Sequence, residues 1–163
     1  MKKTSSMSER LNTLRAGVLG SNDGILTVVG VLFSVAVATT DQFTIFIAGL
    51  SDLLACAFSM AAGEYASVST QKDAEKAAVA KEKQLLKTDF SSELATVKMF
   101  HVERGVSEQT AALIAQDLMS KKPLETIISI KYNLNLGQYM NPWNAALSSL
   151  VSASIGGIFP LAA

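Results

Sequence analysis

Three acidic side chains lie inside apolar stretches of this sequence. Asp23 stands in GSNDGILTVVGVLFSVAVA (residues 20–38), and Asp52 and Glu64 stand in the apolar stretch that follows it. Ionisable groups are costly in a membrane, and they usually face the interior of a helix bundle or a water-filled path. The three acids therefore predict a polar pathway through a membrane.

The second apolar stretch carries a polar stripe along one side of the expected helix. At about 100° per residue, one set of residues falls within roughly a third of the helix circumference. This set is Asp52, Cys56, Ser59, Met60, Gly63, Ser67 and Gln71, with Glu64 at its border. Leu54, Phe58 and Tyr65 lie on the opposite side. The pattern is typical of a helix that lines a pathway with one side and faces lipid with the other.

The types of ligand indicate which ion such a pathway would carry. Carboxylates alone suit Mg²⁺ or Ca²⁺, which prefer hard oxygen donors. The thioether of Met60 adds a soft donor and shifts the preference toward borderline transition metals such as Fe²⁺. Mn²⁺ accepts the same ligands, so the sequence does not separate the two ions.

Each of these residues also has a purely structural interpretation. Met60 could pack against a neighbouring helix, and Asp52 and Glu64 could each cap or bond to one. Asp23 could accept backbone N–H groups near a helix break in its glycine-containing run. The single cysteine, Cys56, is expected to be a small packing residue. A structural role for all of the acids together is a weaker interpretation than a structural role for any one of them.

The elements that hold these residues follow from the placement of charge. All fourteen Lys and Arg residues lie in residues 1–15 and 72–131, and none lies in 16–71 or 132–163. A helix needs about 20 mainly apolar residues to cross a bilayer. We therefore expect an all-α integral membrane bundle with three spans. Its expected parts are an N-terminus at 1–15, membrane helices 1 and 2 within 16–71, a helical domain at 72–140 and membrane helix 3 at 141–163.

Charge also predicts orientation and partners. The excess of Lys and Arg places the N-terminus and the 72–140 domain in the cytoplasm. The balance of 14 basic and 14 acidic residues argues against a nucleic-acid partner. Three spans bury a polar stripe poorly, so we expect a homodimer in the lipid bilayer with the pathway near its two-fold axis. Gly20 and Gly24 fit the small-xxx-small pattern of closely approaching membrane helices.

The 72–140 domain reads as a small helical bundle. Strong helix formers predict a helix over 73–89 that continues from membrane helix 2, and a second helix over 92–103. A third helix is expected to start at the N-cap Ser107 and to end before Pro123, and a shorter segment leads to Asn133.

Three longer segments resemble one known family. The run GSNDGILTVVGVLFSVA and the run SMAAGEYASVSTQKDAE (Ser59–Glu75) look like the vacuolar iron transporter family, and NPWNAALSSLVSASIGGIFPL resembles its third span. The resemblance implies a dimer that exports Fe²⁺, and sometimes Mn²⁺, from the cytosol by proton antiport. It places the translocation path at Asp23, Asp52 and Met60, with Glu64 beside them.

The sequence departs from the family in two respects. Members typically have five spans, so three expected spans predict a short or truncated member. The resemblance also implies a cytoplasmic metal site, whose candidate ligands here are Glu75, Glu82, Glu93, Met119 and Glu125. Lys131 follows where relatives often carry carboxylates, and its charge would repel a cation. The alternative is that the five residues lie on solvated helix faces.

No motif predicts an enzyme. The sequence has no Gly-rich phosphate loop and no Ser/His/Asp or Cys/His set, so we expect no cofactor, with Fe²⁺ or Mn²⁺ as cargo and a proton gradient as the driving force. Protonation of the membrane acids would alternate with metal binding. The competing hypothesis is a non-transporting membrane scaffold, or a truncated fragment that dimerises with itself or a full-length relative. The expected location is a bacterial cell membrane, or a vacuolar membrane if the chain is eukaryotic.

Overall fold

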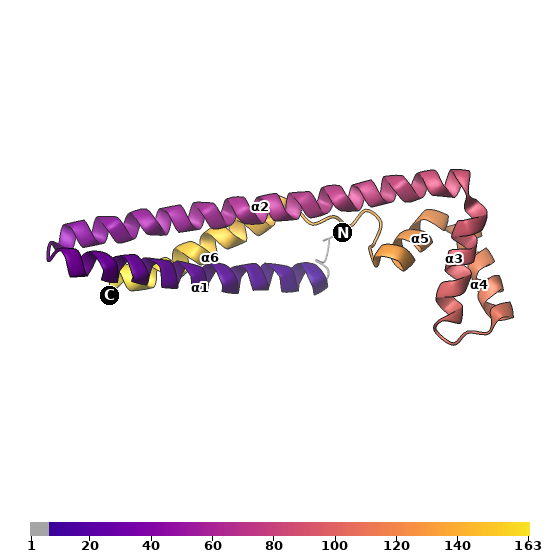
Figure 1. The fold of residues 1–163 in the computed structure, drawn as a ribbon, viewed down its shortest axis with the longest axis horizontal. Coiled ribbons are helices and arrows are strands. Elements are labelled where there is room, and N and C mark those ends of the chain that lie inside the picture. Colours follow the sequence, from indigo (N-terminus) through magenta and orange to yellow (C-terminus); the bar gives the residue numbers. More distant parts are fainter. Residues whose placement is uncertain (1–6) are drawn as a thin grey trace, which may run out of the picture. The chain divides into compact units, whose positions relative to one another are not determined.

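The computed structural model describes residues 7–163, without the side chains of residues 8, 9, 12 and 13. The expected cytoplasmic N-terminus at 1–15 therefore lies partly outside the described residues. Over the described range the chain is helical and contains no strand. Its helices are α1 (Met7–Ala38), α2 (Gln42–Thr88), α3 (Phe90–Val102), α4 (Glu108–Lys121), α5 (Pro123–Tyr132) and α6 (Pro142–Ala162). The helices are labelled in Figure 1.

The described residues form two units, which are treated separately below. Unit 1 contains α1, α2 as far as Thr70, and Met140–Ala163 with α6. Unit 2 is Gln71–Tyr139 and contains the end of α2 together with α3, α4 and α5. Three helices are long and apolar enough to cross a membrane, namely Leu14–Ala38, Gln42–Thr88 and Pro142–Ala162. The expected all-α membrane bundle with three spans is thereby confirmed.

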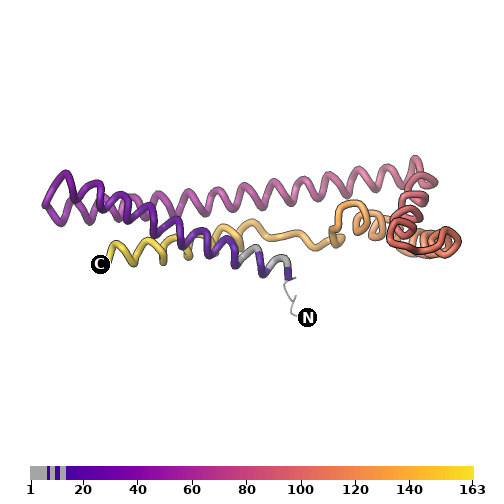
Figure 2. Tube along the Cα trace, turned by 60° about the horizontal axis from the view of Figure 1, so that its bottom comes forward, coloured from indigo at the N-terminus to yellow at the C-terminus, as the bar shows by residue number. Residues whose placement is uncertain are grey.

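In unit 1 three helices lie side by side. Figures 1 and 2 show α1 turning back into α2 through a short loop, and α6 running along both of them. Asp41 in that loop caps α2, because its Oδ2 accepts a hydrogen bond of 2.9 Å from the Thr44 backbone N–H. Asn141 caps α6 through its Oδ1, which accepts from the Trp143 N–H at 3.0 Å. Pro142 follows at the first turn, where its missing N–H costs nothing.

Small residues let α1 and α6 approach closely. A Cβ added to Gly24 would overlap the Ala153 carbonyl oxygen, and a Cβ added to Gly156 would overlap that of Ser21. Gly20 faces the backbone of Ser149 in the same way, with only 3.3 Å between the built Cβ and the Ser149 carbonyl oxygen. The close approach predicted from Gly20 and Gly24 is therefore confirmed, and the partner helix is α6 of the same chain.

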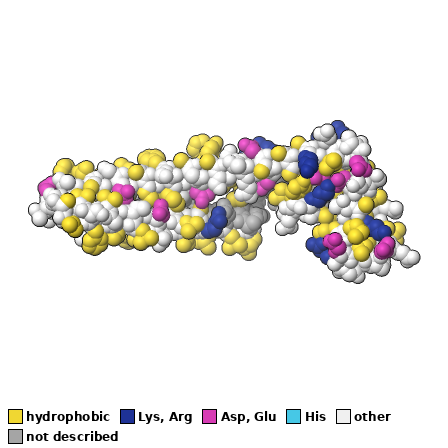
Figure 3. Space-filling model, viewed as in Figure 1, with side chains coloured by type: hydrophobic (Ala, Val, Ile, Leu, Met, Phe, Trp, Pro, Cys, Tyr) yellow, Lys and Arg dark blue, Asp and Glu magenta, His cyan; other side chains and the backbone are white. Residues whose placement is uncertain are grey.

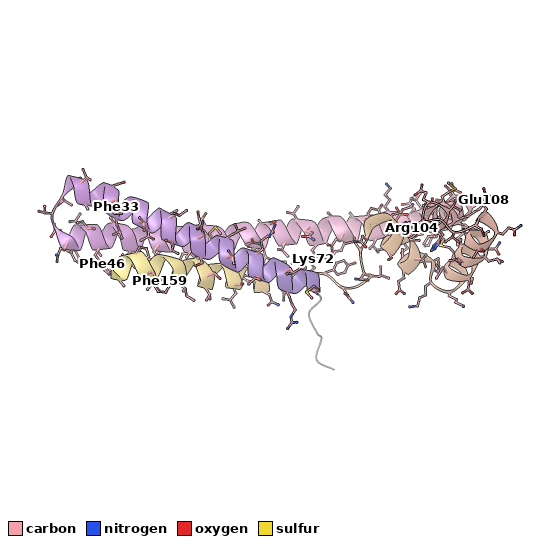
Figure 4. All side chains as sticks on the ribbon, turned by 90° about the horizontal axis from the view of Figure 1, so that it is seen from below. Phe33, Phe46, Lys72, Arg104, Glu108 and Phe159 are labelled. Atoms are coloured by element: carbon pink, nitrogen blue, oxygen red, sulfur yellow. The ribbon has the colours of Figure 1, made fainter. Side chains whose placement is uncertain are left out.

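The outside of unit 1 is apolar. Phe33, Phe43, Phe58, Trp143 and Phe159 expose 64–72% of their surface. Figure 3 shows hydrophobic side chains over the visible face of this unit, and Figure 4 shows Phe33, Phe46 and Phe159 toward the end that holds the α1–α2 loop. So many exposed large apolar side chains are unusual on a soluble protein, whereas a bilayer accepts them.

Unit 2 has its own small core. Val97, Ala115, Met119 and Ile127 are almost fully buried, with Leu86, Leu94 and Ile130 packed against them. The predicted cap is confirmed, since Ser107 Oγ accepts from the Thr110 N–H at 3.4 Å. The predicted helix end before Pro123 is also confirmed, since α4 ends at Lys121, and Pro123 is the first residue of α5. Asn133 ends α5 in the left-handed conformation, with φ of 53°.

Candidate functional site

Asp23 and Cys56 meet between α1 and α2 in unit 1. The Cys56 Sγ donates a hydrogen bond to the Asp23 Oδ2 at 3.5 Å, and both residues are partly buried. The Asp23 backbone carbonyl accepts a second bond, of 3.0 Å, from the Thr27 hydroxyl one turn later. Helix α1 runs unbroken from Met7 to Ala38, so the alternative that Asp23 serves a helix break is wrong. Its carboxylate is directed to a neighbouring helix instead.

Four side chains with metal-binding atoms follow one another along α2 at intervals of four residues. They are Asp52, Cys56, Met60 and Glu64, and each is partly buried. We call this set the α2 donor line. A helix rises about 1.5 Å per residue, so the line extends for about 18 Å of the roughly 30 Å hydrocarbon core. Because residues four apart are neighbours on a helix, a cation at one donor is within a short step of the next.

One oxygen of this line lacks a partner. The Oδ2 of Asp52 is buried, and no hydrogen-bond donor in the described part of the chain reaches it. A buried carboxylate oxygen without a donor costs free energy, since it has lost its water without a replacement. A proton or a metal ion bound there would remove that cost. Asp52 therefore carries a buried carboxylate oxygen that could accept a proton or a metal ion.

The exposure of α2 agrees with the wheel only in part. Leu54 and Phe58 on the expected lipid side are 49% and 64% exposed. Tyr65 on the same side is 38% exposed and also packs on Trp143 of α6, with 4.9 Å between the ring centroids. On the polar side Ser59, Gly63 and Ser67 are exposed. The polar stripe is therefore covered by α1 near Cys56 and uncovered farther along α2.

No closed metal site exists in the described part of the chain. Nowhere there do three or more His, Cys, Asp or Glu side chains gather closely enough to hold a metal ion. The donors of unit 1 are spread along a helix rather than clustered. Such an arrangement suits passage of an ion better than its storage. The roles of Asp23, Asp52, Met60 and Glu64 remain predictions.

The structure does not bring together the five candidate ligands of the cytoplasmic domain. Glu75 accepts a hydrogen bond of 3.1 Å from Gln71 Nε2, and Glu125 forms an exposed ion pair of 2.9 Å with Lys122. Met119 lies in the hydrophobic core with 2% exposure. Only Glu82 and Glu93 meet, and the side chain of Lys131 reaches both of them.

The ionisation of this group in unit 2 follows from its contacts. Burial raises the pKa of Glu82, but hydrogen bonds from Lys131 and Tyr132 outweigh it and bring the pKa below its ordinary value of 4.5. Burial lowers the pKa of Lys131, and its bonds to Glu93 and Glu82 outweigh that and raise it above 10.5. Both residues are therefore charged at neutral pH.

Sequence reasoning missed two contacts. Cys56 was expected to be a packing residue, although its position four residues after Asp52 places it on the polar stripe. Lys131 was expected to repel a cation, and no local pattern indicated that it pairs with Glu82, which lies 49 residues earlier. The first contact had a signal in the helical spacing, whereas the second depends on how α5 packs against α2 and α3.

Comparison with known proteins gives consistent matches. Residues 14–163 match the sequence pattern of the VIT family. The chain is 36% identical over 148 residues to a protein named vacuolar iron transporter from Acanthamoeba castellanii, a match that covers 91% of this chain and 54% of that protein. It is 27% identical over 153 residues to vacuolar iron transporter homolog 2.1 of Arabidopsis thaliana, covering 94% of this chain and 54% of the relative. The chain thus spans about half the length of these relatives.

Proposed function

The chain belongs to the VIT family, and on that premise we propose that it carries divalent iron across a membrane. The proposed direction is out of the cytosol, in exchange for protons, with Mn²⁺ as a second cargo. The α2 donor line is the observation that carries the proposal. It offers carboxylates, a thiol and a thioether in sequence, a mixture of hard and soft donors that suits Fe²⁺ better than Mg²⁺ or Ca²⁺.

Proton exchange is supported by the carboxylate of Asp52. Its buried Oδ2 lacks a donor among the described residues, so it gains from binding either a proton or a metal ion. The two ligands compete for one oxygen, because a bound cation favours the ionised carboxylate and a proton removes the charge that attracts the cation. Asp23 lies beside the line, in contact with Cys56, and we assign it the same alternation.

A second copy of the chain is part of the proposal. Ser59, Gly63 and Ser67 are exposed along the polar side of α2. Polar side chains in a bilayer usually face another helix or a water-filled cavity. We propose that two copies face each other across this side and enclose the path near a two-fold axis. The relatives' names support a vacuolar membrane as the location, while the bacterial cell membrane stays a sequence-based prediction.

Uptake of Fe²⁺ into liposomes tests the proposal. Purified protein is reconstituted, a pH gradient is imposed, and Fe²⁺ uptake is followed for the wild type and for Asp52→Asn. We expect gradient-dependent uptake in the wild type and background uptake in the variant. Asp41→Asn is the matched control, because Asp41 is exposed in the α1–α2 loop and asparagine still caps a helix.

Two results would count against this function. Equal uptake by the wild type and Asp52→Asn would remove Asp52 from the path. A folded wild type without uptake would favour the competing hypothesis of a membrane scaffold or fragment.

A further inference from the structure

Two deeply buried carboxylates of unit 2 share one amine. The side chains of Glu82 on α2 and Glu93 on α3 are only 1% and 6% exposed. The Lys131 Nζ of α5 donates to the Glu82 Oε2 at 2.9 Å and to the Glu93 Oε1 at 2.8 Å, and it lies 2.6 Å from the Glu93 Oε2. The Tyr132 hydroxyl donates to the Glu82 Oε1 at 2.8 Å. We call these four residues the Lys131 cluster.

The charges of the cluster make a cation essential at this point. Two buried carboxylates without a positive partner would repel each other, and each would pay the cost of leaving water. One ammonium group supplies a single positive charge against two negative charges. The Glu93 Oε2 accepts no directed hydrogen bond in spite of its short distance to Nζ. The carboxylate therefore turns both of its oxygens to one positive centre, as it would toward an ion.

The geometry of that centre is close to that of a bound metal ion. Three carboxylate oxygens from two helices lie 2.6–2.9 Å from the Lys131 Nζ. Divalent cations bind carboxylate oxygens at about 2.0–2.6 Å, so a contraction of a few tenths of an ångström would convert the ammonium position into a metal position. Tyr132 holds the remaining oxygen of Glu82, which fixes the orientation of this carboxylate.

We infer that Lys131 is a tethered cation that fills a two-carboxylate site and excludes divalent metal from unit 2. Unit 2 then folds without a metal ion, and Lys131 is the residue that decides this. Replacing it by an uncharged side chain that ends before the Nζ position converts the cluster into a divalent-cation site formed by Glu82 and Glu93. The inference concerns unit 2 and is independent of transport through unit 1.

Binding of Mn²⁺ to the full-length protein in detergent tests the inference. Mn²⁺ stoichiometry is measured from the loss of the free-ion electron paramagnetic resonance signal. Lys131→Met is expected to bind one more Mn²⁺ per chain than the wild type. Lys131→Arg keeps the cation and is expected to match the wild type. The triple variant Lys131→Met with Glu82→Gln and Glu93→Gln is expected to lose the additional ion, which separates this site from the donors of unit 1.

Two results would overturn the inference. One is a double variant, Glu82→Gln with Glu93→Gln, that binds one Mn²⁺ fewer per chain than the wild type. Metal would then displace Lys131 in the wild type. The other is a folded Lys131→Met that gains no ion.

If Lys131→Met does not fold without metal, hydrogen exchange of the α3 and α5 amides is measured with and without Mn²⁺. Protection that returns when Mn²⁺ is added would support the inference, because the ion then replaces the ammonium group. Protection that stays absent at millimolar Mn²⁺ would contradict it, because the carboxylates then do not accept a divalent ion.

Discussion

Cys56 is the side chain through which α2 reaches the carboxylate of α1. Its Sγ lies 3.5 Å from the Asp23 Oδ2, and it stands one helical turn from Asp52 and one from Met60. A thiol in this position can add a soft ligand to two hard ones. Cys56 is also the single cysteine of the chain, so a thiol reagent that modifies the protein reports on this residue only.

Alkylation of Cys56 is therefore expected to block Fe²⁺ uptake, and Mn²⁺ is expected to slow the alkylation. Both effects follow from the position of the thiol on the proposed path, where a bulky adduct would obstruct the ion and a bound ion would shield the sulfur. The rate of N-ethylmaleimide incorporation, measured by mass spectrometry, checks the second effect. Cys56→Ala serves as the control for the first, since its uptake should be insensitive to the reagent. Alkylation at the same rate with and without Mn²⁺ would argue against a ligand role.

Glu82 is expected to be the most important single carboxylate for the stability of unit 2. Glu82→Gln removes the charge of a carboxylate whose side chain is 1% exposed and leaves the Lys131 ammonium group, whose side chain is 24% exposed, with one partner fewer. Losing a hydrogen-bonded partner of this kind is expected to cost about 1–3 kcal/mol. Hydrogen exchange of the α3 and α5 amides measures the loss. Glu125→Gln is the control, because its ion pair with Lys122 is exposed and such pairs contribute about 0–1 kcal/mol. A similar small effect for both variants would contradict this role of Glu82.

The pH dependence of unit 2 follows from the same contacts. The pKa of Glu82 is lowered from 4.5, so its contribution is present above pH 4.5 and is lost as the pH falls through the lowered value. The pKa of Lys131 is raised from 10.5, so its contribution is present below that pH and is lost as the pH rises through the raised value. Protection of α3 and α5, corrected for intrinsic exchange, should stay level from about pH 5 to 9. A steady decline between pH 7 and 5 would exclude Glu82 as the titrating group.

At the scale of the elements, the contact between α1 and α6 depends on the absence of side chains. Gly24 and Gly156 each lie against a carbonyl oxygen of the other helix. In a membrane, helices gain little from hydrophobic burial, so close backbone packing of small residues is a main source of association. This contact sets the position of α1 and with it that of Asp23.

Gly24→Ala is expected to destabilise unit 1, because its Cβ would overlap the Ala153 carbonyl oxygen and push α6 away. Overpacking of this kind typically costs about 1–3 kcal/mol. Gly30→Ala on the same helix is the control, since nothing lies within 4 Å of its Cβ position. The temperature at which half of the protein aggregates in detergent measures the difference. Equal midpoints for the two variants would mean that α1 and α6 do not depend on this approach.

Much of the fold was predictable because its signals are local. Stretches without Lys or Arg predicted the spans, and Ser107 marks a helix start in the sequence as it does in the structure. The role of Asp89 as the N-cap of α3 was missed, and Asp89 was predicted as the last residue of the 73–89 helix. One aspartate shortly before two serines is a weak signal of a helix boundary. Helical periodicity likewise selected the α2 stripe, whereas the partner of each stripe residue depends on tertiary packing.

The partners of the candidate residues could not be read from the sequence for a physical reason. Gly20 and Gly24 predicted a close helix contact, but spacing within one helix does not identify the second helix. The pairing of Lys131 with Glu82 and Glu93 joins three helices, and such contacts arise from packing rather than from local propensity. The five cytoplasmic metal ligands were predicted from the family resemblance, and the structure joins only Glu82 and Glu93 of them, through Lys131.

At the scale of the whole molecule, the chain combines an apolar exterior with polar groups inside unit 1. In Figure 3 hydrophobic side chains are spread over the visible face of unit 1, with a few Asp and Glu side chains among them, while Lys and Arg side chains gather mainly on unit 2. This division matches a membrane-spanning unit and a unit that faces water. The chain spans about half the length of the relatives named above, so transport by this chain is a proposal that rests on its own residues.

Proton movement driven by metal tests the proposed exchange most directly. The protein is reconstituted in liposomes that contain a pH-sensitive dye, Fe²⁺ is added outside without a pH gradient, and the internal pH is followed for the wild type and Asp23→Asn. Exchange predicts that Fe²⁺ entry drives protons out and raises the internal pH in the wild type, and that the change is lost in Asp23→Asn. An Fe²⁺-driven pH change that persists in Asp23→Asn, or is absent from a wild type that takes up Fe²⁺, would contradict it.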